Sequence, residues 1–229
     1  MDAKDRLIVA LDFSDLTEAR ELTIKLDGIV SFYKVGWDLF LAGGIPFVKE
    51  LFAHGNKVFL DLKLDDIPET VKRSIKQLHH CGAHFFTLQG DHETFQAAQT
   101  GRGAAPYPKA FLFVPVLSSR LEGNFDLEAR QELEIMVKGG IEGVVASGKM
   151  VGLIREYFIY SRKDLIIVAP GIRQTGQSYN DHRRSLTPTQ ALKAGADYLV
   201  VGRPIRDAKD PRKATEAILA EMQGALTSG

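Results

Sequence analysis

Short apolar runs alternate with longer amphipathic stretches along most of this chain. Several of the runs are rich in β-branched or aromatic residues and have Gly, Pro or Asp at their ends, which is typical of buried strands. We predict strands over residues 7–11, 32–35, 57–62, 84–88, 110–117, 143–146, 165–169 and 198–201. The amphipathic stretches predict helices over residues 16–26, 45–54, 67–81, 93–99, 127–138, 149–157, 188–194 and 211–226.

Signals at the ends of these stretches support the helix predictions. Thr187 followed by Pro188 fits a helix start, with Thr as the N-cap and Pro in the first turn. Gly82, Gly139 and Gly195 each follow a predicted helix, where a glycine suits a left-handed C-cap.

Strict alternation of eight strands and eight helices predicts parallel strands joined by right-handed crossovers. Eight such units close into a (β/α)8 barrel, also called a TIM barrel, and 229 residues are compact but sufficient for one barrel domain over residues 1–229. The rival architecture is an open doubly wound sheet. That fold favours a glycine-rich fingerprint after an early strand, and Asp12-Phe13-Ser14 offers none.

Composition narrows the class of protein. The chain carries 29 basic and 29 acidic residues, and a net charge of zero argues against a general nucleic-acid binder. A single cysteine, Cys81, cannot form an internal disulfide, and we expect it to be a buried apolar residue. The longest apolar run, residues 110–117, is far too short to cross a bilayer. No signal peptide is visible before Asp12, so we expect a cytoplasmic protein with no membrane partner.

Charged residues gather where the predicted strands end, which is the catalytic face of such a barrel. Lys34 lies within an apolar run, where a lysine needs a partner. Asp61, Lys63 and Asp66 form an Asp-x-Lys-x-x-Asp pattern that begins at the end of the third strand. Residues two apart on a strand share a side, so Asp61 and Lys63 should face the barrel axis and meet Asp66 just beyond. Nearby carboxylates favour the charged lysine, which suits it to donate a proton; a structural ion-pair network is the alternative.

A second constellation predicts phosphate binding. Gly171 and Arg173 follow the seventh strand, and Gly202 and Arg203 follow the eighth. The loops after these two strands frequently bind phosphate in this fold. Glycine lets backbone N–H groups approach an anion, and arginine offers paired donors. The polar stretch 174–181 is either a loop that closes over a ligand or a surface loop. Trp37 is expected to pack rather than to stack on a ligand.

Five segments in order resemble the orotidine 5′-monophosphate decarboxylase family across essentially the whole length. They are residues 10–13, 33–36, 61–70, 169–173 and 195–205, of which the third and the last are the most specific. The resemblance implies decarboxylation of orotidine 5′-monophosphate to uridine 5′-monophosphate in pyrimidine nucleotide biosynthesis, without a metal or an organic cofactor. It also implies a homodimer whose active sites are completed across the interface.

The resemblance assigns roles residue by residue. Lys63 resembles the proton donor to the carbon that loses carbon dioxide, and Asp61 the acid beside the substrate carboxylate. Lys34 and Asp12 would hold the ribose and the charge array. The other implied contacts are Asp66 and Thr70 in the partner's site, Ser118 at the pyrimidine, and Arg173, Gly202 and Arg203 at the phosphate.

The chain departs from the family pattern at four positions. Asp65 stands where the family often has His, Glu69 where it often has Asn, and Gln89 where a His is common. His182 stands where a phosphate-binding Gln is usual, and a histidine can still donate there. Two other functions remain open: a magnesium-dependent sugar-phosphate decarboxylase or aldolase of the same barrel group, and a non-catalytic barrel that binds a phosphate ligand.

Overall fold

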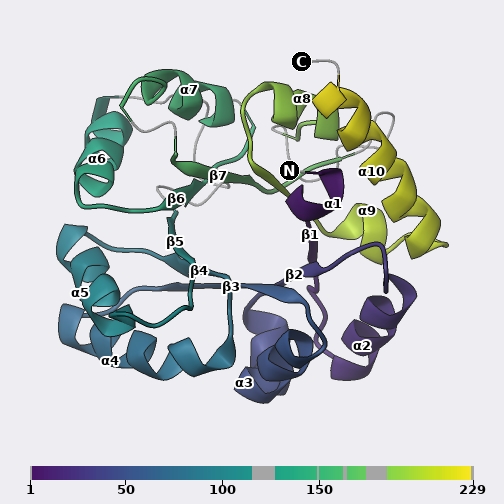
Figure 1. The fold of residues 1–229 in the computed structure, drawn as a ribbon, viewed down its shortest axis with the longest axis horizontal. Coiled ribbons are helices and arrows are strands. Elements are labelled where there is room, and N and C mark those ends of the chain that lie inside the picture. Colours follow the sequence, from purple (N-terminus) through teal and green to yellow (C-terminus); the bar gives the residue numbers. More distant parts are fainter. Residues whose placement is uncertain (1, 115–126, 149, 162–163, 174–184, 228–229) are drawn as a thin grey trace.

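Eight parallel strands close into a barrel in sequence order, with β1 paired to both β2 and β8 (Figure 1). The structure is a computed structural model that describes residues 2–114, 127–148, 150–161, 164–173 and 185–227. The strands are β1 Leu7–Ala10, β2 Phe32–Val35, β3 Lys57–Leu64, β4 Phe85–Leu88, β5 Ala110–Phe113, β6 Gly143–Val145, β7 Ile166–Ala169 and β8 Tyr198–Val201. The predicted barrel is confirmed, and the open sheet is excluded.

Helices form the outer layer around this barrel (Figure 1). They are α1 Ala3–Arg6, α2 Leu16–Lys25, α3 Trp37–Ala53, α4 Pro68–Leu78, α5 His92–Arg102, α6 Leu127–Lys138, α7 Met150–Tyr157, α8 Pro188–Lys193, α9 Arg203–Arg206 and α10 Pro211–Thr227, with a 3-10 turn at His79–Cys81. The pattern missed α1 and α9, because a four-residue helix is too short to show a helical period. Among the described residues, no helix is long and apolar enough to span a bilayer.

Helix α3 begins eight residues before its predicted start. It runs from Trp37, and its backbone is non-helical at Gly44, where φ is 56°. Gly43 and Gly44 followed by Pro46 favour a break, so the pattern revealed only the part after it. The start of α3 follows directly on the end of β2, so it lies at the carboxyl ends of the strands, where the active sites of such barrels are found.

Two strand ends differ from the prediction by two residues or more. Strand β3 runs on to Leu64, two residues beyond the predicted end, and its pairing with β4 shifts register between Leu60 and Leu64. Strand β5 ends at Phe113, whereas the prediction ran to residue 117, and residues 115–117 lie outside the described part.

The predicted helix caps are confirmed except at one glycine. The Thr187 side chain accepts a hydrogen bond in a capping box at the start of α8. Gly82 and Gly195 have φ of 77° and 102°, as left-handed caps require. The prediction for Gly139 is wrong, because the positive φ of 89° is at Gly140. The N–H of Gly139 still donates to a carbonyl four residues back, so the chain reverses one residue later.

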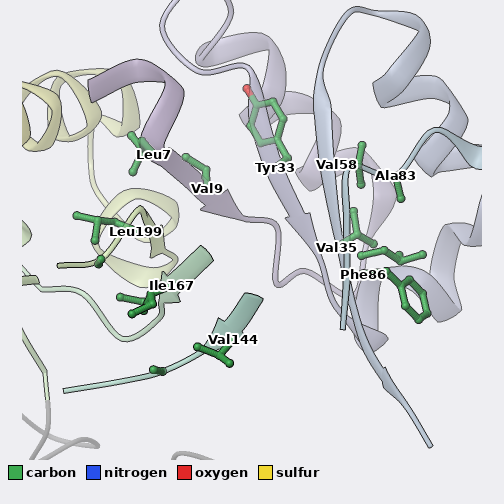
Figure 2. Close-up of a cluster of buried hydrophobic side chains, with 14 of the residues drawn as sticks. Leu7, Val9, Tyr33, Val35, Val58, Ala83, Phe86, Val144, Ile167 and Leu199 are labelled. Atoms are coloured by element: carbon green, nitrogen blue, oxygen red, sulfur yellow. The ribbon is translucent and has the colours of Figure 1, made fainter. Parts of the chain in front are cut away.

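The core has two layers, and together they orient the site. Side chains of the strands alone fill the inside of the barrel: Ile8, Ala10, Phe32, Phe59, Phe85, Ala110, Leu112, Val168 and Val200. The alternate residues pack outward against helices, among them Leu7, Val9, Tyr33, Val35 and Leu199 in Figure 2. Because side chains alternate along a strand, the residue two positions after an inward residue also points inward. On β2, β3 and β4 these residues are Lys34, Asp61 and Thr87.

Candidate active site

Four charged side chains form a line of alternating sign at the carboxyl ends of β1, β2 and β3. Lys34 Nζ lies 2.8 Å from Asp12 Oδ1 and 3.7 Å from Asp61 Oδ2. Lys63 Nζ donates to Asp61 Oδ1 at 2.9 Å. Each lysine therefore has a carboxylate within ion-pair distance, which offsets the cost of holding an ammonium group at the end of an apolar barrel. The expectation that Lys34 has a charged partner is confirmed.

Asp61 and Lys63 meet, but regular strand geometry is not the reason. Leu62 packs in the outer layer as predicted, and it is buried. Lys63 itself has a φ of 50°, in the left-handed region that residues with a Cβ rarely adopt. The two side chains meet as predicted, but the alternation of a regular strand does not by itself account for it. A local distortion of β3 turns the Lys63 side chain toward Asp61.

An open cavity lies beside this charged line. It is lined by Asp12, Lys34, Gly36, Trp37, Asp38, Leu39, Asp61 and Lys63. A Cβ on Gly36 would lie 3.2 Å from Lys34 Nζ, so the glycine leaves room for the ammonium group. The Lys63 side chain is 30% exposed, against 12% for Lys34, so Lys63 is the more open of the two lysines. The cavity can thus present an ammonium group to a small anionic molecule.

Trp37 does not pack in the core as the sequence suggested. Its side chain is half exposed at the cavity, and its ring N–H donates to the carbonyl oxygen of Leu62 at 2.9 Å. Cys81, in contrast, is buried as expected, and burial raises the pKa of its thiol. A buried, protonated thiol has no role as a nucleophile here.

Within one chain, no ion pair or side-chain hydrogen bond between described residues joins Asp66 or Thr70 to the charged line. Asp66 is exposed, and its Oδ1 accepts from the N–H of Ile67 at 2.7 Å, just before α4. Among the described residues, no ion pair of Asp66 is found, so the expectation that it meets Lys63 in the same chain is wrong. Thr70 is half-buried in the first turn of α4.

The predicted phosphate residues come from adjacent strands. Strands β7 and β8 pair directly, which brings the loops that carry Arg173 and Arg203 to one edge of the barrel. A Cβ on Gly202 would lie 3.6 Å from Asp12 Oδ2, so this edge adjoins the charged line. Gly171 has a φ of 77° and open space where its Cβ would be. Ser118 and His182 lie outside the described residues.

The sequence reasoning missed Thr87. This residue is fully buried on β4, and its Oγ1 donates to Asp61 Oδ1 at 3.0 Å. The same Oγ1 accepts from the backbone N–H of Lys63 at 2.8 Å. The signal was present, because Thr87 is a lone polar residue in the run 85–88 and lies two positions after the inward-facing Phe85.

The fold and the site together define a class of protein. A closed parallel barrel with charged side chains and a cavity at the carboxyl ends of its strands is the arrangement of (β/α)8-barrel enzymes. Comparison with known proteins defines the family. The model of the family described as "Orotidine 5'-phosphate decarboxylase / HUMPS family" matches residues 5–218.

Relatives and solved structures agree with this match. The chain is 42% identical to an orotidine 5'-phosphate decarboxylase of Rhodopseudomonas palustris (strain BisA53), over 99% of this chain and 98% of that protein. It is 41% identical to one of Nitrobacter winogradskyi, over 98% and 95%. The crystal structure of orotidine 5'-phosphate decarboxylase from Lactobacillus acidophilus superposes with a TM-score of 0.79 at 32% identity, covering 95% of this chain and 98% of that one.

The chain belongs to the orotidine 5'-phosphate decarboxylase / HUMPS family. It is an enzyme, a decarboxylase of the lyase class. The resemblance stated from the sequence is thereby confirmed.

Proposed function

We propose that this enzyme converts orotidine 5′-monophosphate to uridine 5′-monophosphate and carbon dioxide, with Lys63 as the proton donor and with no metal or organic cofactor. Membership of the family indicates this reaction in pyrimidine nucleotide biosynthesis. The observation that carries the proposed mechanism is the ammonium group of Lys63, held 2.9 Å from Asp61 beside an open cavity.

The reaction is difficult because loss of carbon dioxide leaves an electron pair on a ring carbon with no adjacent electron sink. Enzymes of such slow reactions lower the barrier by about 20 kcal/mol. In the proposed step, the bond from the ring carbon to the carboxylate breaks and carbon dioxide leaves. A proton moves from Lys63 Nζ to the ring carbon, and the neutral amine then regains a proton from water. A fixed ammonium charge facing the developing carbanion also stabilises it before the proton moves.

The other members of the charged line have supporting roles. Asp61 orients the ammonium of Lys63 and would lie beside the substrate carboxylate. Lys34, paired with Asp12 at 2.8 Å, would bind the ribose hydroxyls together with that acid. Arg173, Gly202 and Arg203 would hold the phosphate, with Ser118 at the pyrimidine and His182 in the place of the usual glutamine. Phosphate binding supplies remote binding energy that aligns the ring with Lys63.

Asp66 and Thr70 act, in this proposal, in the active site of a second copy of the chain. Asp66 is exposed just before α4, and Ile67 beside it is 66% exposed. Trp37 and Leu41, one turn apart on α3, are also exposed apolar residues, at 51% and 77%. A homodimer that covers these apolar side chains would bring the Asp66 of each chain to the Lys63 of the other.

Two variants test the central role. Lys63→Ala should abolish turnover, measured by the change in pyrimidine absorbance of orotidine 5′-monophosphate, while the product uridine 5′-monophosphate still binds. Full activity in that variant would dispose of the proton-donor role. Mixing Lys63→Ala with Asp66→Asn tests the shared site, because a mixed dimer has one intact site. Random assortment should restore about a quarter of wild-type activity, and no recovery would contradict the shared site.

A magnesium-dependent reaction is the second candidate, because the matching family model also covers the HUMPS group. Asp12 and Asp61 each lie within ion-pair distance of a lysine, which leaves these carboxylates less suited to a divalent cation. A chelator separates the two: activity that survives supports the proposed reaction, and activity that is lost and returns with magnesium supports the rival. If orotidine 5′-monophosphate binds without an absorbance change, the protein would be a non-catalytic barrel that binds a phosphate ligand.

A further inference from the structure

Two side chains form hydrogen bonds with the peptide group that joins Leu62 to Lys63, one with its N–H and one with its carbonyl oxygen. Its N–H, on Lys63, donates to Thr87 Oγ1 at 2.8 Å. Its carbonyl oxygen, on Leu62, accepts from the ring N–H of Trp37 at 2.9 Å. In a regular strand, backbone groups of neighbouring strands would occupy these places. Here the β3–β4 register shifts between Leu60 and Leu64, and a side chain from β4 and one from α3 serve as partners instead.

This peptide group determines where the Lys63 side chain points. The angle φ is the rotation about the N–Cα bond, so the orientation of this peptide plane and the φ of Lys63 together set the direction of the side chain. Lys63 has a φ of 50°, and among the described residues it is the one non-glycine residue with a positive φ. Such a backbone is costly for a residue with a Cβ, and it persists only where the surroundings hold it.

Thr87 also holds the acid that pairs with Lys63. Its Oγ1 donates to Asp61 Oδ1 at 3.0 Å. Asp61 Oδ1 also accepts a hydrogen bond from Lys63 Nζ at 2.9 Å. One buried hydroxyl group therefore contacts both the backbone of the lysine and the carboxylate that receives its ammonium group. A hydroxyl can do both at once, since it has one proton to donate and lone pairs to accept.

We propose that Thr87 is a positioning residue of this active site, with Trp37 as its counterpart on the opposite side of the peptide group. The two side chains hold Lys63 in its left-handed conformation, so that its ammonium group meets Asp61 and faces the cavity. In a strand of regular conformation, the Lys63 side chain would take another direction. The activity test of this inference rests on the proposed function.

Two substitutions of one residue separate the hydroxyl group from the packing. Thr87→Val has nearly the same shape but no hydroxyl, and Thr87→Ser keeps the hydroxyl. We expect kcat for orotidine 5′-monophosphate to fall by about 100-fold in Thr87→Val, because small misplacement of a reacting group has effects of this size. KM should stay within about threefold, since the phosphate residues on β7 and β8 are untouched. Thr87→Ser should keep kcat within about threefold of wild type.

Thr215 offers a matched control. It is also fully buried, and its Oγ1 donates to the carbonyl oxygen of Pro211 on α10. Thr215→Val should lower the melting temperature but leave kcat unchanged. Trp37→Phe removes the ring N–H donor, and we expect kcat to fall by about 10-fold. Because both side chains hold one peptide group, the loss in the double variant should be smaller than the product of the two single losses.

A second measurement does not depend on the substrate. The amide of Lys63 should exchange with deuterium at least about tenfold faster in Thr87→Val than in wild type, since its acceptor is gone. Unchanged exchange, unchanged kcat, or an equal loss of kcat in Thr87→Ser would each overturn the inference. A wild-type enzyme that leaves orotidine 5′-monophosphate unchanged would instead refute the proposed function, and the exchange experiment would still test the positioning of Lys63.

Discussion

Replacing Asp61 by Asn removes one negative charge from between two ammonium groups. Asp61 Oδ1 accepts from Lys63 Nζ at 2.9 Å, and Asp61 Oδ2 lies 3.7 Å from Lys34 Nζ. The side chains of Lys34 and Asp61 are only 12% and 17% exposed, so water cannot fully replace the lost carboxylate. Asn keeps the shape and one acceptor oxygen but leaves the two lysines facing each other across a neutral group.

The distances allow a rough magnitude. Two unit charges about 4 Å apart near a protein surface interact by about 4 kcal/mol before desolvation is counted. In Asp61→Asn, Lys34 still pairs with Asp12 at 2.8 Å, and water still reaches the Lys63 side chain, which is 30% exposed. Both ammonium charges therefore stay partly stabilised. Breaking a fully buried pair costs about 3–5 kcal/mol. For this partly exposed one we expect the free energy of unfolding to fall by about 2 kcal/mol, which lowers Tm by about 4–8 °C.

The assay is thermal unfolding of the ligand-free protein at neutral pH, followed by circular dichroism. Glu21→Gln is the matched control, because Glu21 Oε2 lies 3.6 Å from Lys25 Nζ with both side chains more than half exposed. That variant should stay within about 0.5 kcal/mol of wild type. A Tm for Asp61→Asn equal to or above that of wild type would refute the reasoning, since it would mean that the lysines do not need this carboxylate.

Three further outcomes are expected. If Arg203 binds the phosphate as proposed, Arg203→Ala removes a charged hydrogen bond and should raise KM for orotidine 5′-monophosphate by about 10-fold or more; steady-state kinetics measure this, and an unchanged KM counts against the phosphate assignment. Gly101→Ala should lower the free energy of unfolding by about 2–3 kcal/mol, because its Cβ would collide with the backbone carbonyl of Lys72. Gly224→Ala, in open space on α10, should raise the free energy of unfolding by about 0.5–1 kcal/mol. Denaturant unfolding measures both variants, and equal changes in the two free energies would be evidence against the packing argument. Burial and two nearby lysines lower the pKa of His84 below 6.5. The unfolded chain therefore binds the proton more readily, and stability should fall as pH drops below about 6.5; His84→Gln should reduce that dependence in melts from pH 7 to 5, and an identical dependence would exclude His84 as the cause.

Local pattern was sufficient to predict the barrel and the face that carries the chemistry. The predicted strands over residues 32–35 and 198–201 match β2 and β8 at both ends, and all other strand limits except the end of β5 agree to within two residues. Lys34 and Asp61 could be placed near the carboxyl ends of their strands because each is a charged residue in the last part of a predicted apolar strand. The start of α3 at Trp37 could not be predicted, since a short helical segment before a Gly-Gly break carries too little periodic signal.

The sequence by itself determined the order of strands and helices, because hydrophobic spacing is a local property that residue types report directly. It also placed the ionisable groups at the strand ends. Only the tertiary structure decided how Lys63 meets Asp61, because the left-handed backbone of Lys63 depends on Thr87 from another strand and Trp37 from a helix. The same holds for Asp66, which forms no ion pair with Lys63 in the described part of one chain. Such contacts depend on distances between segments far apart in sequence, which residue spacing does not encode.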